Sequence, residues 1–88
     1  MLPKRTAKAI GKLALSIYEF EKTGDELPMH THEPGTAHLT MVNKGSIRAY
    51  GYTWERVLVA GNLVIFAPND PHAFEALEDN TRITNLVY

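Results

Sequence analysis

The chain has 88 residues, 9 Lys and Arg against 10 Asp and Glu, and no cysteine. This length allows one domain with one core. A net charge of −1 gives no long-range attraction to nucleic acid or to an anionic membrane, so neither is expected as a partner. The lack of cysteine excludes disulfides and thiolate ligands and is compatible with a cytoplasmic location.

The first 12 residues are expected to form an N-terminal arm. Its secondary structure is open, because residues 6–15 fit either about two turns of helix or a strand. We interpret its basic side chains as a solvated surface rather than a phosphate-binding patch. These side chains are Lys4, Arg5, Lys8 and Lys12.

Residues 13–88 are expected to form a single domain of short strands separated by Gly, Pro and Asn turns. The continuous apolar run at residues 63–67 predicts a strand that is buried on both faces. Many short strands of this kind predict an all-β sandwich or barrel. The expected strands cover residues 13–21, 27–32, 37–42, 46–52, 56–59, 63–67, 72–77 and 82–88.

The four histidines are spaced as if they meet at one point. His30 and His32 are two residues apart, so in a strand their side chains project to the same face. His38 follows six residues later, and His72 comes directly after a Pro-Asn-Asp-Pro turn. Because neutral imidazole is a common ligand of divalent transition metals, the pattern favours a metal site over four unrelated structural histidines.

The region around the first three histidines resembles the first sequence motif of the cupin superfamily. In that motif a Gly precedes a His-x-His pair, and a Glu and a second Gly follow it. The positions that keep the motif are Gly24, His30, His32 and Gly45. His38 stands where the family has the Glu.

The second cupin motif is matched from Gly61 to His72, which keep the family's spacing. Three of its positions differ, since Ala67, Asn69 and Ala76 replace a Pro, a Gly and an Asn. The change to Asn69 is mild, because asparagine tolerates the left-handed backbone conformation that a turn glycine supplies. The chain is therefore similar to the small single-domain cupins.

This resemblance implies a double-stranded β-helix, the jelly-roll barrel of the cupins, over residues 13–88. It also implies one divalent Fe, Mn, Ni, Zn or Cu ion as cofactor. With His38 in place of Glu the ion's charge is uncompensated, which should favour an anionic bidentate ligand such as a carboxylate or enolate. The alternative is three ligands, with His38 a core or rim residue. The expected metal ligands are His30, His32, His38 and His72.

Three functions are compatible with this site. The first is a metal-dependent enzyme of dioxygenase, isomerase or lyase type that acts on a small oxygen-rich or carboxylate-bearing molecule. The second is a non-catalytic cupin that binds or senses a small ligand, and the third is a purely structural metal site.

No general base can be named, because the positions in phase with His38 and His72 are mostly apolar. Glu33 and Glu75 are possible carboxylate ligands, but both are out of phase with their neighbouring histidines and should point outward. The alternative for Glu33 is that Pro34-Gly35 breaks the alternation and lets it point inward. The in-phase positions are Thr40, Val42, Phe74 and Ala76.

The chain is expected to form a homodimer through its N-terminal arm and the strand that begins at residue 13. Together these segments carry more apolar surface than the outside of a small barrel should expose. The alternative is an arm that folds back on its own barrel and leaves a monomer. The apolar residues are Ile10, Leu13, Leu15 and Ile17.

Overall fold

The computed structural model describes residues 1–31, 37–67 and 69–88. These residues form nine strands, all in antiparallel sheets, and no helix. The strands are β1 (Lys4–Ile10), β2 (Leu13–Phe20), β3 (Glu26–His30), β4 (His38–Lys44), β5 (Ser46–Tyr50), β6 (Glu55–Val59), β7 (Leu63–Phe66), β8 (His72–Ala76) and β9 (Thr81–Val87).

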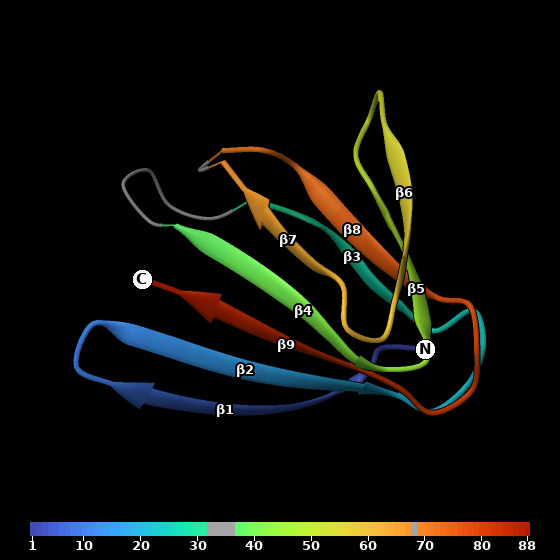
Figure 1. Cartoon of the computed structure of the whole chain (residues 1–88), viewed down its shortest axis with the longest axis horizontal. Coiled ribbons are helices and arrows are strands. Elements are labelled where there is room, and N and C mark those ends of the chain that lie inside the picture. Colours follow the sequence, from blue (N-terminus) through green and yellow to red (C-terminus); the bar gives the residue numbers. More distant parts are fainter. Residues whose placement is uncertain (32–36, 68) are drawn as a thin grey trace.

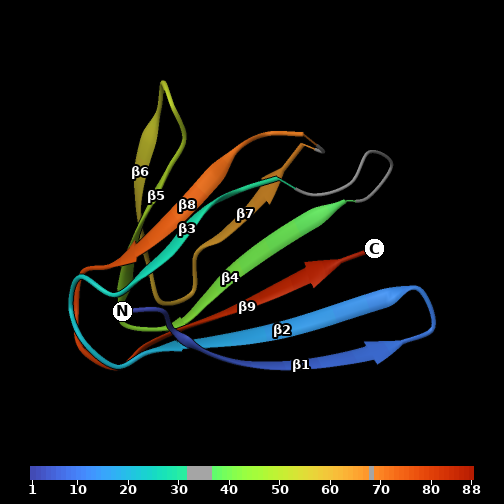
Figure 2. The same ribbon diagram turned by 180° about the vertical axis from the view of Figure 1, so that it is seen from behind.

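Two sheets face each other. The large sheet has the strand order β1-β2-β9-β4-β7 and the small sheet the order β3-β8-β5-β6. The sheets converge where the chain begins and spread apart towards the C terminus, as both views show (Figure 1, Figure 2). Neighbours in each sheet are mostly distant in sequence, which is the strand order of a jelly-roll barrel, so the predicted fold class is confirmed.

The predicted strands are present, and their ends lie within two residues of the predicted positions. The strand expected to reach His32 ends at His30, and His32 lies outside the described residues. The sequence of the N-terminal arm left a helix and a strand as alternatives, and the structure has a strand there. β1 pairs with β2 along its whole length and forms the outer edge of the large sheet.

The core lies between the sheets, because alternate residues of each strand point inward. In β4, for example, His38, Thr40 and Val42 are buried whereas the residues between them are half-buried. Burial of one large apolar side chain stabilises the fold by about 1.5–3 kcal/mol. The apolar core consists of Phe20, Val42, Ile47, Ala49, Leu58, Phe66, Phe74, Ala76 and Ile83.

The prediction that residues 63–67 are buried on both faces is wrong. β7 is an edge strand of the large sheet, and Leu63 and Ile65 are 50% and 66% exposed. The run is apolar on both faces because its outward side chains are part of an aliphatic surface that spans the sheet. We call this surface the outer face of the large sheet. By strand register this face comprises Leu13, Leu15, Ile17, Leu39, Met41, Leu63, Ile65 and Leu86.

Two turns show why particular residues occupy them. Asn69 has a φ of 69°, which confirms that it supplies the left-handed conformation expected of the family's glycine. Gly45 has a φ of 79°, and a Cβ there would overlap the side chain of Thr81 and lie 3.1 Å from its Cα. Within the described residues, no helix is long and apolar enough to cross a membrane.

Candidate metal centre

Three of the four histidines lie where strands end or begin on one side of the barrel. His30 ends β3, His38 begins β4 and His72 begins β8. Figure 1 shows these strand ends on the same side of the molecule, together with the end of β7. We call this region, with His30, His38, His72 and Phe66, the histidine end of the barrel.

A β-bulge in β3 turns His30 towards the interior. Leu27 is paired with Phe74 and His30 with His72, so three residue steps on β3 match two on β8. The extra residue falls at Pro28-Met29, where a proline cannot donate to the strand ladder. Pro28 is the signal in the sequence that could have indicated this bulge.

The imidazole rings pack directly against one another. The ring centroids of His30 and His72 are 4.5 Å apart in an edge-to-face arrangement, and those of His38 and His72 are 4.9 Å apart and stacked. Phe66 stacks on His72 with a centroid distance of 4.1 Å. His38 and His72 are almost fully buried, and His30 is half-buried. The structure thus brings together three of the predicted ligands, and His32 lies outside the described residues.

Hydrogen bonds to the protein assign the proton on each ring. Nδ1 of His30 lies 2.7 Å from the carbonyl of Pro28, and Nδ1 of His72 lies 2.8 Å from the carbonyl of Asp70. A carbonyl oxygen only accepts, so both rings carry their proton on Nδ1 and present Nε2 as the basic nitrogen.

The third ring is oriented by a hydroxyl group. The Thr40 hydroxyl donates to Oδ1 of Asn85 over 2.8 Å and lies 3.2 Å from Nε2 of His38. Since its only proton is directed to Asn85, it accepts from His38 Nε2–H, and Nδ1 becomes the basic nitrogen of His38. Asn85 was not predicted as part of the site, although its inward position in β9 could have indicated it.

The donor chemistry fits a transition metal. Metal-binding histidines characteristically donate the second ring nitrogen to a backbone carbonyl or another fixed acceptor, as the three described rings do. Among residues 1–31, 37–67 and 69–88, no group of three or more His, Asp or Glu side chains has a metal-holding geometry. His32 and Glu33 lie outside those ranges.

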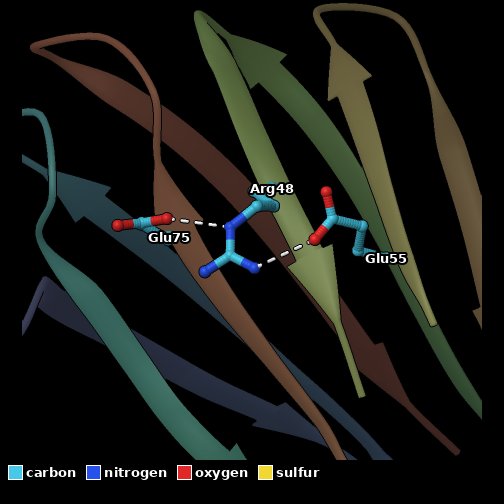
Figure 3. A network of polar contacts seen from close by, with 3 residues as sticks. All are labelled: Arg48, Glu55 and Glu75. Atoms are coloured by element: carbon cyan, nitrogen blue, oxygen red, sulfur yellow. Dashed lines mark hydrogen bonds and ion pairs between the residues drawn. The ribbon is translucent and has the colours of Figure 1, made fainter. Parts of the chain in front are cut away.

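Glu75 points away from the histidines, as predicted. Its carboxylate accepts a hydrogen bond of 2.9 Å from Arg48 Nε on the outside of the small sheet, where Arg48 also pairs with Glu55 at 3.5 Å (Figure 3). The hydrogen bond from Arg48 to Glu75 raises the pKa of the guanidinium, which also lies over the ring of Tyr50. Glu75 is therefore part of a surface ion pair.

The interior beside the histidines is mostly apolar, as predicted. The buried positions in phase with His38 and His72 are Thr40, Val42, Phe74 and Ala76. A shallow surface pocket of about 330 Å³ lies nearby, since Phe66 and Asp70 contribute to its lining, but none of the described histidines lines it.

Several solved structures share this fold. The chain is 21% identical to KdgF from a Halomonas species, with a TM-score of 0.83 over 94% of this chain and 74% of that one. An RmlC-like cupin protein from Desulfovibrio desulfuricans is 18% identical, with a TM-score of 0.87 over 98% and 81% of the two chains. The cupin-2 domain of an XRE-family transcriptional regulator from Enterobacter cloacae is 18% identical, with a TM-score of 0.86 over 100% and 97%.

No family model matches the sequence, and no curated protein matches it either. The structural likeness nevertheless extends over nearly the whole chain. The chain therefore has the cupin fold, the double-stranded β-helix that its two sequence motifs predicted.

Proposed function

We propose that the histidine end binds one divalent transition metal ion, with Fe, Mn, Ni, Zn and Cu as the candidate metals. One observation carries the proposal: three imidazoles from three strands pack together, each with one nitrogen anchored to the protein. His38 and His72 are buried and His30 is half-buried, and polar rings in such positions cost stability unless hydrogen bonds or a ligand engage their nitrogens. The proposed ligands are His30, His32, His38 and His72.

The bound ion would serve as a Lewis acid that polarises an oxygen ligand. Around it the protein supplies orientation and exclusion of water. Thr40 and Asn85 fix the ring of His38, while Phe66 covers one face of His72. With four neutral ligands the site favours an anionic partner. We therefore propose a metal-dependent enzyme of dioxygenase, isomerase or lyase type, acting on a small oxygen-rich or carboxylate-bearing molecule.

A second candidate is a cupin that binds or senses such a molecule without turning it over. It is supported by the fold likeness to a cupin-2 domain of a transcriptional regulator. Incubation of the metal-loaded protein with small carboxylates separates the two functions, because an enzyme forms product and a sensor only binds. A metal site closed to every added carboxylate favours the third possibility, a structural ion.

The metal proposal is tested by elemental analysis of protein purified without a histidine tag. We expect about one divalent ion per chain. His38→Ala should weaken metal binding less than the double change His30→Ala with His32→Ala, because three ligands remain. Glu75→Ala is the matched control, since it removes a carboxylate from the outside of β8 and should leave metal binding unchanged.

Two outcomes would contradict the metal proposal or its details. Wild-type protein that takes up no divalent ion contradicts metal binding altogether. Metal binding that His38→Ala leaves unchanged contradicts the assignment of four ligands and favours His38 as a core residue. Equal loss of metal in His38→Ala and in the double variant contradicts the expected order of the two effects.

We also propose a homodimer in which a second subunit covers the outer face of the large sheet, including the same face of the N-terminal arm, residues 1–12. The outer face offers aliphatic side chains from β2, β4, β7 and β9, and Ile10 of β1 is 67% exposed. Sedimentation equilibrium of the full chain and of a chain that lacks residues 1–12 tests this assembly. A folded monomer at micromolar concentration contradicts it, and a dimer that weakens on truncation supports it.

The remaining proposals concern partners and location. A net charge near zero supports a small-molecule partner rather than nucleic acid or a membrane surface. A cytoplasmic location stays a prediction, supported by the lack of cysteine. Fractionation of cells that produce the tagged protein tests it.

A further inference from the structure

One row of polar side chains crosses the inner face of the large sheet. Ser16 of β2 is opposite Asn85 of β9, which in turn is opposite Thr40 of β4. The three residues are 9%, 4% and 0% exposed. Buried hydroxyl and amide groups cost stability unless they are hydrogen-bonded, so each member of the row needs a polar partner.

The row begins at a cation and ends at the histidines. Arg5 of β1 donates from Nε and Nη2 to the Ser16 hydroxyl over 3.2 Å and 3.1 Å. At the other end Thr40 links Asn85 to His38. The carbonyl oxygen of Asn85 is engaged by Thr40, so the amide of Asn85 offers its NH₂ donors to a ligand. A guanidinium and an amide thus supply donors on the inner face.

Arg5 differs from the other basic residues of the arm in its direction. Lys4 and Lys8 are opposite Glu19 and Leu15, which alternate with the inward residues of β2, whereas Arg5 reaches inward to Ser16. Among the described residues, no carboxylate lies within ion-pair distance of Arg5. Arg5 is therefore available to an external anion.

The neighbouring inward positions are small. β1 continues from Arg5 towards the histidine end with alanines at its inward positions, and β2 has an alanine opposite the second of these. All three alanines are exposed to solvent, so a small molecule can approach the polar row from this side. These residues are Ala7, Ala9 and Ala14.

We propose that Arg5, Ser16 and Asn85 bind the carboxylate of a small hydroxylated acid whose other end is held at the histidines. This inference rests on the proposed function and names its substrate class. A guanidinium binds a carboxylate through paired, charge-assisted hydrogen bonds. Ser16 and Thr40 are two strand spacings apart, about 9.5 Å, which suits an acid with a backbone of roughly four to seven carbons.

The test uses the metal-loaded protein and a series of aldonates with four to seven carbons, each compared with the alditol of the same length. Isothermal titration calorimetry measures both. We expect wild-type protein to bind at least one aldonate at least tenfold more tightly than its alditol, because only the acid carries the carboxylate. Arg5→Gln should abolish this preference and leave the affinity for the alditol and the metal content unchanged.

Lys8→Gln is the matched control, since it removes the same charge from the same strand on the opposite face. It should leave the aldonate preference intact. Ser16→Ala should lower the aldonate affinity about threefold, in line with the loss of one hydrogen-bonding group. Thermal unfolding of each variant establishes that it is folded, and a purely structural role of Arg5 would lower the midpoint without changing the preference.

Two results would overturn the inference: wild-type protein that binds no aldonate better than its alditol, or equal effects of Arg5→Gln and Lys8→Gln. Failure of the metal proposal is distinguishable from either. It appears as missing metal in the wild-type protein, and the aldonate preference and its dependence on Arg5 can still be measured on the protein as purified.

Discussion

The two ends of the barrel interior differ in what they contain. The histidine end holds three imidazoles and, one row deeper, the polar groups of Thr40 and Asn85. The opposite end, which we call the packed end, is filled by Phe20 and Ile47 and tied by backbone hydrogen bonds between its turns. We infer that the packed end supplies most of the stability, which lets the histidine end retain buried polar groups.

The largest effect should come from Phe20→Ala at the packed end. Phe20 is fully buried, and loss of such a ring leaves a cavity that costs about 3–5 kcal/mol. That is a large part of the stability of a domain of this size. Chemical denaturation should therefore show a strongly lowered midpoint. His30→Ala, which changes a half-buried ring at the histidine end, should cost clearly less, and the reverse order would contradict the comparison.

Gly45→Ala should destabilise the packed end by more than the backbone cost alone. A residue with Cβ in the left-handed region costs about 1–2 kcal/mol, and at Gly45 the new Cβ also overlaps the side chain of Thr81. Gly61→Ala is the matched control, because its φ is also positive, at 94°, but nothing lies within 4 Å of the added Cβ. Equal changes in the free energy of unfolding would show that Thr81 moves aside without cost.

Thr40→Val tests the row of polar side chains, Ser16, Asn85 and Thr40, that lies between the histidine end and the packed end. It keeps the shape of the side chain but removes the hydroxyl between His38 and Asn85, which should cost about 1–3 kcal/mol. If the metal is bound as proposed, its affinity should also fall by about 10-fold or more, because His38 loses its orienting partner. Thr84→Val on the outer face removes a hydroxyl that binds exposed Asn43, and it should change neither quantity appreciably.

The sequence predicted the strands well because their turns carry strong local signals. Gly45, Gly61 and Asn69 occupy positions with positive φ, and each marks the end of a strand or its connection. The meeting of His30, His38 and His72 was likewise predictable, because the spacing of the two cupin motifs pointed to one place. The expectation that His30 and His32 share a face of a strand stays a prediction. The turn signals are local and do not depend on which strands pair with one another.

Predictions failed where a residue's environment is set by a neighbouring strand. The run at residues 63–67 is apolar throughout, so its pattern could not show that one face lies outside the barrel at a sheet edge. Arg5 was grouped with three lysines of the arm, since only the pairing of β1 with β2 reveals that it reaches inward to Ser16. Both failures concern the pairing of strands, which the composition of a single segment does not reveal.

The smallest effect concerns a contact between turns that closes the packed end. Asp79 accepts hydrogen bonds of 2.8 Å and 2.9 Å from the backbone N–H and the hydroxyl of Thr23, and these bonds lower the pKa of Asp79. The folded protein therefore holds the Asp79 proton less tightly than the unfolded chain does. The contact stabilises the fold fully above the ordinary pKa of aspartate, about 3.9, and this contribution is lost as the pH falls through the lower folded value.

Asp79→Asn should accordingly lower the thermal midpoint slightly at neutral pH, and the difference from wild type should shrink below about pH 4. Thr23→Val is the companion change, because it removes the hydroxyl donor but keeps the backbone donor, so its effect should be smaller and have the same pH dependence. Thermal unfolding at several pH values measures both. A difference that stays constant from neutral to acid pH would show that Asp79 acts through its shape rather than its charge.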